Sequence, residues 1–285
     1  MNRTDEPLPP SVHALIDLAL EEDAGRGDVT TRLCVPAGVH GSGSVSAKGG
    51  CVLSGLDVFA AVLERVDGET VCHAVAHDGD QVGAGGLVVE VEGRLSSLLV
   101  AERVALNFLQ RLSGIATLTR RFVEALPAGS KARIVDTRKT TPGLRWFERR
   151  AVRHGGGGNH RADLAGGILI KENHVAAAGS IHVTVAACRA GAPHSLRVQV
   201  EVRDLAGLRE ALAAGADAVL LDNMTAGQVR ECVEIAGGRV LVEASGGVEL
   251  ATVPALALAG VDVISVGALT HSAPAADLSF LVRGA

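Results

Sequence analysis

The sequence predicts an α/β protein whose C-terminal half is a barrel of six strand–helix units. From Lys131 onward, short apolar runs alternate with amphipathic or alanine-rich stretches, an order typical of parallel strands covered by helices. Because only six strands are visible where the common barrel has eight, we expect a six-unit form. We expect strands at residues 132–136, 168–171, 197–202, 218–222, 240–244 and 261–266, with helices between them, for example at 205–214 and 226–236.

Charged residues at the ends of these strands favour a barrel over an open doubly wound sheet. Five of the six strands carry one at or next to the C-terminal end, and Gly267 follows the sixth. In a barrel the carboxyl ends converge on one mouth, where active sites lie, whereas an open sheet would spread them along an edge. The five charged residues are Asp136, Lys171, Glu201, Asp222 and Glu243.

The first 113 residues are organised differently and predict a separate N-terminal domain. Residues 42–95 contain short β-type runs, interrupted by an expected helix at 57–66. Further helices are expected at 12–22, with Ser11 as its N-cap, and at 97–112, and residues 21–31 are expected to form a solvated turn. We assign residues 1–113 and the C-terminal segment 272–285 to this domain, and residues 114–271 to the barrel.

Composition limits the class of protein. The formal net charge of −5 and the aromatic content of 2% argue against a nucleic-acid surface, which needs a basic domain with stacking aromatics. The five cysteines are widely spaced and form no C-x-x-C, so neither a zinc site nor a disulfide framework is expected. Because the sequence shows no apolar signal core and no long uncharged apolar run, we expect a cytoplasmic protein that binds neither nucleic acid nor membrane.

The segment from Asp136 to His174 is cationic within an acidic chain. It holds eight Lys and Arg residues against four acids, a local balance of +4, and four consecutive glycines follow an expected helix at 144–154. Glycine lets a ligand approach the backbone closely, because it has no Cβ. The segment therefore indicates a concave site for a small, multiply charged anion.

Several side chains of this segment suit anion binding. Arg138 makes bidentate contacts to carboxylate or phosphate, whereas Lys139 acts as a point charge. Lys171 ends a buried apolar strand, which favours a role in a site. His160 and Arg161 are adjacent, and adjacent residues of a strand point to opposite faces, so both reach one site only where the chain is irregular.

Acidic residues and small-residue turns complete the expected mouth. Glu201 and Asp222 could pair with Lys171, bind ribose hydroxyls or hold Mg²⁺, which typically takes one or two protein carboxylates plus substrate phosphates. A ring of ion pairs closing the barrel is the structural alternative. The turns at 244–247 and 266–269 have small residues that leave backbone N–H groups free for a phosphate.

Several motifs, in this order, resemble those of the quinolinate phosphoribosyltransferase family along nearly the whole chain. They are GDVTT at 27–31, AERVALNFLQRLSGIAT at 101–117, DTRKTTPGLR at 136–145, GGGGNHR at 155–161, LIKENH at 169–174, LLDNM at 220–224, EASGG at 243–247 and VGALTHS at 266–272. The resemblance implies an N-terminal α/β sandwich and an open six-stranded parallel α/β barrel. It also implies a head-to-tail homodimer, or a higher oligomer built from it, with shared active sites.

The resemblance further implies an activity and its residues. The activity is transfer of phosphoribosyl from phosphoribosyl pyrophosphate to quinolinate with decarboxylation, giving nicotinate mononucleotide, pyrophosphate and CO₂ in NAD biosynthesis. Lys139, Lys171, Glu201 and Asp222 would be catalytic, and the two acids would hold Mg²⁺, directly or through water. The residues for quinolinate would be Arg103 (from the partner subunit's helix), Thr137, Arg138, His160, Arg161 and Lys171. Those for phosphoribosyl pyrophosphate would be Lys139, Lys171, Glu201, Asp222, Ser245, Gly246, Gly247, Val266, Gly267, Ala268 and His271.

Four positions depart from the family's usual residues, and three other functions are alternatives. Asp163 stands where glycine is common, Gly166 and Glu172 where aspartate is common, and Gln199 where glutamate is common. An acid near Arg161 could weaken affinity for a dianion, so a paralogue acting on another aromatic acid is one alternative. A barrel aldolase or decarboxylase that uses Lys171 as a Schiff-base nucleophile is the second, and a non-catalytic anion-binding protein is the third.

Overall fold

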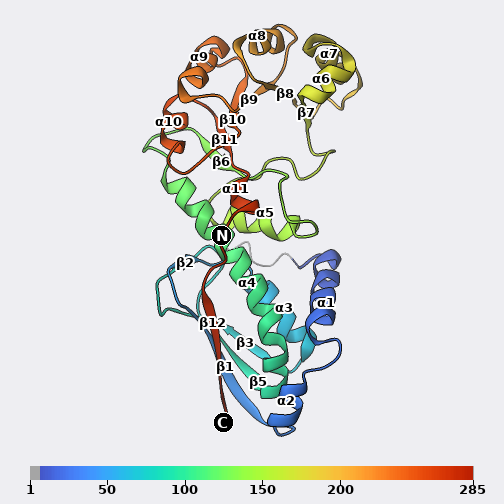
Figure 1. Ribbon diagram of the computed structural model, residues 1–285, viewed down its shortest axis with the longest axis vertical. Helices are drawn as coiled ribbons and strands as arrows, with labels where there is room; N and C mark the ends of the chain where they lie inside the picture. The colour runs from blue at the N-terminus through green and yellow to red at the C-terminus, as the bar shows by residue number, and fades with distance from the viewer. Residues whose placement is uncertain (1–6, 285) are drawn as a thin grey trace. The chain divides into compact units, whose positions relative to one another are not determined.

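The structure is a computed structural model that describes residues 7–284, in two compact units (Figure 1). The described part of unit 1 comprises residues 7–117, 146–155 and 273–284, and unit 2 comprises residues 118–145 and 156–272. The start of the proline-rich N-terminal segment, residues 1–6, lies outside the described residues, as does Ala285. None of the helices between residues 7 and 284 is both long and apolar enough to cross a membrane.

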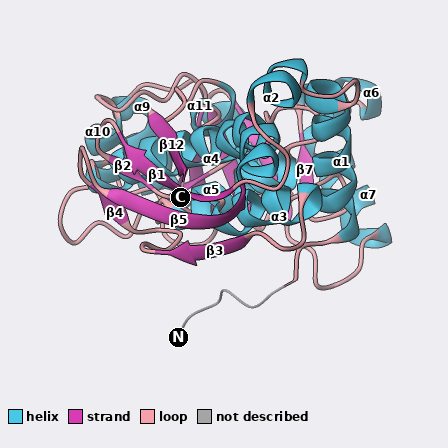
Figure 2. Cartoon of the chain, turned by 90° about the horizontal axis from the view of Figure 1, so that it is seen from below, coloured by secondary structure: helices cyan, strands magenta, loops and turns pink. Residues whose placement is uncertain are grey.

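Unit 1 is built around a four-stranded antiparallel sheet. Figure 2 shows β1 (His40–Ala47), β5 (Leu87–Arg94) and β12 (Leu278–Gly284) side by side, and the full strand order is β12-β1-β5-β3, with β3 at Val71–Ala74. Val45 pairs with Phe280 on one side and with Val89 on the other. The C-terminal segment is therefore an integral strand of this unit. A separate pair joins β2 (Cys51–Val52) to β4 (Gln81–Val82).

The helices of unit 1 correct three sequence expectations. Helix α1 (Pro10–Ala24) is capped by Pro9 and not by Ser11, because Pro10 has the fixed φ and missing N–H that suit a first helical position. Helix α2 (Val29–Cys34) begins inside the expected turn, where the Asp28 carboxylate accepts the Thr31 N–H at 3.0 Å. Helix α3 (Leu56–Val66) matches its prediction. Helix α4 (Leu95–Glu124) runs twelve residues past the expected end at 112, because its apolar period continues through Ile115 and Phe122.

Helix α5 (Arg145–His154) lies almost wholly in unit 1, although the sequence prediction placed it in the barrel domain. Its buried side packs on α4, where the Phe147 and Phe108 rings stack with centroids 5.4 Å apart. Beside them, the Glu148 carboxylate is fully buried and accepts from Arg111 Nη2 at 2.8 Å. These contacts form between segments distant in sequence, which is why the local pattern did not reveal them.

Unit 2 contains a six-stranded parallel sheet whose strands are close to those predicted. They are β6 (Arg133–Val135), β7 (Ile168–Ile170), β8 (Val198–Val202), β9 (Ala218–Asp222), β10 (Leu241–Ser245) and β11 (Val263–Ser265). The strand order in the sheet is β6-β11-β10-β9-β8-β7, so neighbouring strands from β7 to β11 are consecutive in the chain. Strands β6 and β7 are the two edges of the sheet. Beyond β6, Val135 bridges to Gly158. The expected open six-stranded α/β barrel is confirmed.

Most helices of unit 2 lie around the outside of this sheet, and the one at residues 268–271 lies at the mouth instead (Figure 1). Side-chain caps fix several of their starts, since Ser180, Asp204 and Thr225 each accept a backbone N–H of the following turn. The expected helices at 205–214 and 226–236 are confirmed. The helices are α6 (Glu172–Ala178), α7 (Ile181–Gly191), α8 (Leu205–Ala213), α9 (Ala226–Ala236), α10 (Val253–Leu258) and α11 (Ala268–His271).

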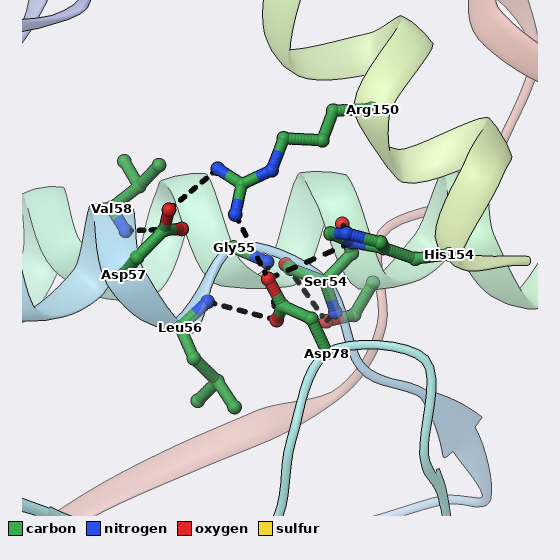
Figure 3. Close-up of polar contacts among 9 residues, drawn as sticks. Ser54, Gly55, Leu56, Asp57, Val58, Asp78, Arg150 and His154 are labelled. Atoms are coloured by element: carbon green, nitrogen blue, oxygen red, sulfur yellow. Dashed lines mark hydrogen bonds and ion pairs between the residues drawn. The ribbon is translucent and has the colours of Figure 1, made fainter. Parts of the chain in front are cut away.

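A partly buried polar cluster in unit 1 joins α5 to the start of α3 (Figure 3). Arg150 Nη1 lies 2.6 Å from the Asp57 carboxylate, and Arg150 Nη2 lies 3.5 Å from Asp78. The other oxygen of Asp78 accepts the backbone N–H groups of Gly55 and Leu56. Beside it, Ser54 Oγ lies 2.9 Å from His154 Nδ1, and Asp78 Oδ2 lies 3.6 Å from that same nitrogen.

Because His154 lies in this cluster, the free energy of unfolding should depend on pH in a window that begins at pH 6.5 and extends to lower pH. Burial lowers the pKa of His154 from 6.5, although the Asp78 charge opposes it. The unfolded chain then binds more protons than the folded one just below pH 6.5, so the free energy of unfolding falls as the pH drops through that window. We expect His154→Asn, which keeps an acceptor but cannot titrate, to flatten this fall in urea unfolding. Equal slopes for the two proteins would contradict the assignment.

Candidate active site

Strand alternation decides which side chains enter the barrel of unit 2. Successive residues of a strand point to opposite faces, so every second residue faces the interior. Glu201 of β8, Asp222 of β9 and Ser245 of β10 line one interior cavity. The residue next to each of them in its strand (Val202, Leu221 and Ala244) is buried on the opposite face of the sheet. The register places Asp222 beside Ser245. The carboxyl ends of the strands thus bring their polar residues to a common mouth.

The cavity at this mouth has a volume of about 790 Å³. It gathers residues from strands β7 to β11 and from loops that follow the strands, including the loop after β6, and all but two of the predicted site residues line it. The predicted site residues that line the cavity are Thr137, Arg138, Lys139, His160, Arg161, Lys171, Glu201, Asp222, Ser245, Gly246, Gly247, Gly267, Ala268 and His271. Val266 is buried and does not line the cavity, and Arg103 belongs to unit 1, where its guanidinium lies 3.7 Å from Glu102.

Ion pairs at the rim connect strands β7, β8 and β9. Lys171 Nζ lies 3.0 Å from a Glu201 oxygen, and Arg203 Nε lies 3.6 Å from Asp222. Arg203 also pairs with Glu172 at 2.5 Å. Glu201 and Asp222 therefore each have a cationic neighbour, and Arg203 is a residue that the sequence interpretation did not select.

Two guanidinium groups, those of Arg138 and Arg161, lie side by side in the wall of the cavity. Burial and the nearby Arg138 charge both lower the pKa of Arg161, whereas Asp163 opposes them. Arg138 Nε is buried and has no hydrogen-bond partner among residues 7–284. Since arginine stays protonated in proteins, these groups form a cationic pocket with an unused donor. The Asp163 carboxylate is engaged locally, because its Oδ1 accepts the N–H groups of Ala165 and Gly166.

Residues outside the predicted set hold the loops in place. Arg145 donates to Thr140 Oγ1 at 3.0 Å, to the Arg138 carbonyl at 3.3 Å and to the Ala162 carbonyl at 3.2 Å, which ties two mouth loops together. Thr270 Oγ1 donates to the Lys139 carbonyl at 2.8 Å. Arg145 and Thr270 both lie inside the motifs quoted above, but nothing in their local pattern shows that they bond to carbonyl groups of neighbouring loops.

The chain is irregular at 159–161, which lets His160 and Arg161 face the same cavity as expected. The buried Asp136 carboxylate accepts the Asn159 side-chain amide at 2.6 Å and the His160 backbone N–H at 2.7 Å. The glycine run at 155–158 precedes this segment and allows Gly158 to pair with β6, where the Gly158 N–H donates to the Ile134 carbonyl at 2.8 Å. Asp136 therefore positions the segment that carries two predicted ligand residues.

The turn after β10 has the geometry of a phosphate cradle. Gly246 has φ of +85°, and a Cβ built there would overlap the side chain of Asn223. Asn223 itself has φ of +56°, and its N–H donates to the Ser245 carbonyl at 2.9 Å. At Gly267 a Cβ would come within 3.2 Å of Lys139 Cδ. The turn after β10 therefore needs glycine at position 246, whereas at Gly267 a Cβ would only crowd the side chains of His271 and Lys139.

Glu243 is the main residue whose role the sequence interpretation missed. It was placed at the end of its strand, but β10 continues to Ser245, so Glu243 lies inside the barrel and is 2% exposed. It lines the mouth cavity and also a second interior cavity of about 700 Å³. A charged residue within an apolar run could have signalled a buried interior position.

Fold and cavity together define an α/β-barrel protein whose mouth combines arginine, lysine and carboxylate side chains. The family model of the quinolinate phosphoribosyl transferase N-terminal domain matches residues 28–113, and that of the C-terminal domain matches residues 115–281. The chain belongs to the quinolinate phosphoribosyltransferase family and is an enzyme of the phosphoribosyltransferase class.

Individual relatives agree with this placement. The chain is 43% identical to the nicotinate-nucleotide pyrophosphorylase (carboxylating) of Mycobacterium leprae over 267 residues, which are 91% of this chain and 93% of that protein. It is 41% identical over 262 residues to the probable enzyme of the same name from Bacillus subtilis, covering 90% of this chain and 89% of the relative. The crystal structure of NadC from Streptococcus pyogenes matches with a TM-score of 0.94 at 41% identity, covering 99% of this chain and 100% of that one.

Alanine at Gly246 should damage the cradle more than alanine at Gly247. Both glycines have positive φ, a conformation that costs a residue with a Cβ about 1–2 kcal/mol. Only Gly246→Ala adds an overlap with Asn223, because the nearest atom to a Cβ at Gly247 is 3.7 Å away. We expect Gly246→Ala to lower the free energy of unfolding further and to weaken inorganic pyrophosphate binding by calorimetry. Equal losses in the two variants would contradict this geometry.

Proposed function

We propose that the protein transfers the phosphoribosyl group of phosphoribosyl pyrophosphate to quinolinate, with loss of CO₂, to give nicotinate mononucleotide and pyrophosphate. The observation that carries the proposal is one 790 Å³ cavity that combines Arg138 and Arg161 with the Lys171–Glu201 pair and two glycine turns. Guanidinium groups suit a dicarboxylate, and backbone N–H groups beside glycine suit phosphate. The relatives' names, which describe this activity, support the same assignment.

In this proposal the cavity separates two kinds of charge. Pyrophosphate leaves C1 of the ribose with the bonding electrons, so the sugar gains positive charge while the leaving group takes negative charge. Lys139 stabilises the departing pyrophosphate, and Glu201 and Asp222 hold the ribose hydroxyls next to the cationic carbon. Fixed charges of this kind are usually the largest single contribution to catalysis.

The acceptor then completes the reaction without an organic cofactor. The quinolinate ring nitrogen forms a bond to C1 and becomes cationic. When the 2-carboxylate leaves as CO₂, the C–C bonding electrons remain on ring carbon 2, where the adjacent cationic nitrogen stabilises them until a proton binds there. Arg138 and Arg161 orient the two carboxylates so that the nitrogen faces C1, and Thr137 lies beside them in the cavity.

Magnesium is part of the proposal. The residues between 7 and 284 form no group of three or more His, Cys, Asp or Glu side chains suited to a metal. Glu201 and Asp222 at the rim fit the usual case in which Mg²⁺ binds one or two carboxylates and substrate phosphates. When bound, the ion would neutralise pyrophosphate charge. The acids of this chain would hold it only together with the substrate.

The alternatives fit the cavity less well. Lys171 Nζ forms an ion pair with Glu201 at 3.0 Å, whereas a Schiff-base nucleophile needs a free amine. A passive anion binder would not need the acid pair. A paralogue for another aromatic acid shares the phosphate side of the cavity, and its acceptor would differ at the Arg138 and Arg161 side.

We also propose a cytoplasmic homodimer with shared active sites. Unit 1 exposes the large apolar side chains of Leu18, Val29 and Leu33, a feature of surfaces that bind partner chains. Arg103 is half-exposed on α4 and is available to a partner subunit's cavity. The five cysteines are all free, which suits a reducing compartment.

Turnover with quinolinate, phosphoribosyl pyrophosphate and Mg²⁺ tests the proposal directly. We expect CO₂ and nicotinate mononucleotide from quinolinate and no product from nicotinate. Lys139→Ala should lower kcat by about 10²–10³-fold, the usual effect of removing one transition-state donor. Lys131→Ala is the matched control, because Lys131 pairs with Asp262 on the surface of the same unit. The assignment would be refuted if nicotinate gave product and quinolinate did not, or if Lys139→Ala and Lys131→Ala lowered kcat equally.

A shared site predicts complementation between two inactive variants. Arg103→Ala removes a unit 1 residue and Lys171→Ala removes a unit 2 residue, so a mixed dimer contains one intact site. In a 1:1 mixture, random exchange makes about half of the dimers mixed, and each of these has one intact site out of two. We therefore expect up to about a quarter of the activity of the same amount of wild-type protein. Exchange can be followed by fluorescence energy transfer between labelled subunits. Exchange without any recovery would contradict the shared site.

A further inference from the structure

Glu243 lies at the boundary between the two interior cavities of the barrel. Three residues line both the 790 Å³ mouth cavity and the 700 Å³ cavity behind it, namely Glu243, His160 and Arg161. Glu243 is fixed by its strand, since β10 pairs with β9 and β11 on its two sides and sets Glu243 against Leu220 and Val263. A rigid strand thus holds a buried carboxylate directly behind the irregular segment that carries His160 and Arg161.

The carboxylate of Glu243 is held ionised by its neighbours. Gln199 Nε2 donates to Glu243 Oε2 at 2.7 Å, and His160 Nε2 lies 3.4 Å from the same oxygen. Burial raises the pKa of Glu243, but the contacts with His160 and Gln199 outweigh it and leave that pKa below 4.5. A buried anionic acceptor with two neutral or cationic donors is a strong orienting group.

The contacts of the His160 ring assign a role to each nitrogen. Nδ1 accepts the Arg161 backbone N–H at 2.8 Å, so Nδ1 carries the lone pair. The ring proton then lies on Nε2, which faces Glu243. The hydrogen bond at one nitrogen of an imidazole fixes the state of the other. Asp136 holds the His160 backbone N–H at 2.7 Å, so both the ring and the main chain are fixed.

We propose that Glu243 is a positioning residue, which together with Gln199 orients His160 and thereby fixes Arg161 for binding an acceptor carboxylate. The backbone N–H of Arg161 donates to His160 Nδ1. At the other end of the side chain, Arg161 Nη1 donates to the Gly167 carbonyl at 2.8 Å. Arg161 is therefore held at its backbone by the His160 ring and at its guanidinium by the Gly167 carbonyl. This inference rests on the proposed function only in naming quinolinate as the acceptor.

Gln199 has a specific part in this arrangement. Glutamate at this position would place a second carboxylate within hydrogen-bond distance of Glu243 in a buried space. Two such acids cannot both ionise readily, so they would share a proton. The neutral amide avoids this conflict and supplies a donor. Gln199 thus leaves Glu243 free to act as a full anion toward His160.

The first test separates the two substrates. We expect Glu243→Ala to raise KM and the directly measured Kd for quinolinate by about tenfold or more, since a misplaced binding group can cost up to 100-fold. KM for phosphoribosyl pyrophosphate should change by less than about twofold, because that side of the cavity does not involve Arg161. Glu243→Gln keeps an oxygen that can accept from His160 and should restore most of the quinolinate affinity.

Val242→Ala is the matched control for damage to the barrel. Val242 is the preceding residue of β10, is buried, and faces away from the interior. This variant should lower stability without a selective effect on quinolinate. If Glu243→Ala weakens both substrates equally, or if Val242→Ala shows the same selectivity, the positioning role is rejected.

A second measurement needs no substrate. The Nε2–H signal of His160 in the unliganded protein should be visible and protected from exchange with water in the wild type, because this N–H faces Glu243. In Glu243→Ala it should shift upfield and exchange faster, whereas the tautomer itself stays fixed by the Arg161 N–H. An unchanged Nε2–H signal would overturn the proposal even if the variant bound quinolinate weakly. A protein that never turns over quinolinate, yet shows this change in the Nε2–H signal, would reject the proposed function and keep the contact between Glu243 and His160.

Discussion

Two buried carboxylates, Asp136 and Glu243, hold the segment on which the mouth of the barrel depends. The six-stranded sheet does not close, and the chain beyond β6 passes through glycines so that Gly158 can pair there. The residues after Gly158 have no ladder to satisfy their polar groups. Asp136 accepts two donors from Asn159 and His160, and Glu243 faces the His160 ring. An open barrel therefore keeps an ordered wall through side-chain acceptors in place of backbone pairing.

The sequence was informative where structure follows from a local repeat. Each strand of unit 2 is an apolar run of a few residues between turn signals, so its position could be predicted within one or two residues. The convergence of Lys171, Glu201 and Asp222 on one cavity followed from the rule that parallel strands end at the same edge. The irregular chain at His160 and Arg161 was also predictable, because no strand could place both residues in one site.

The features that the sequence did not reveal depend on contacts between distant segments. Helix α5 packs on α4 through Phe147 and Glu148, whose partners lie some forty residues earlier in the chain. Glu243 was assigned to the end of its strand because the apolar run was expected to stop at residue 244, whereas β10 continues to Ser245. Only the register of neighbouring strands shows that it faces an interior that also contains Gln199.

The pairing of β12 with β1 affects the order in which the protein can be completed during synthesis. Unit 2 has all its residues by Ser272, whereas the sheet of unit 1 needs residues 278–284 to cover an edge of β1. The part of the chain made first therefore cannot complete its sheet until residues 278–284 have been made and have left the ribosome. Until then β1 has one unpaired edge, which is a surface open to wrong strand pairing.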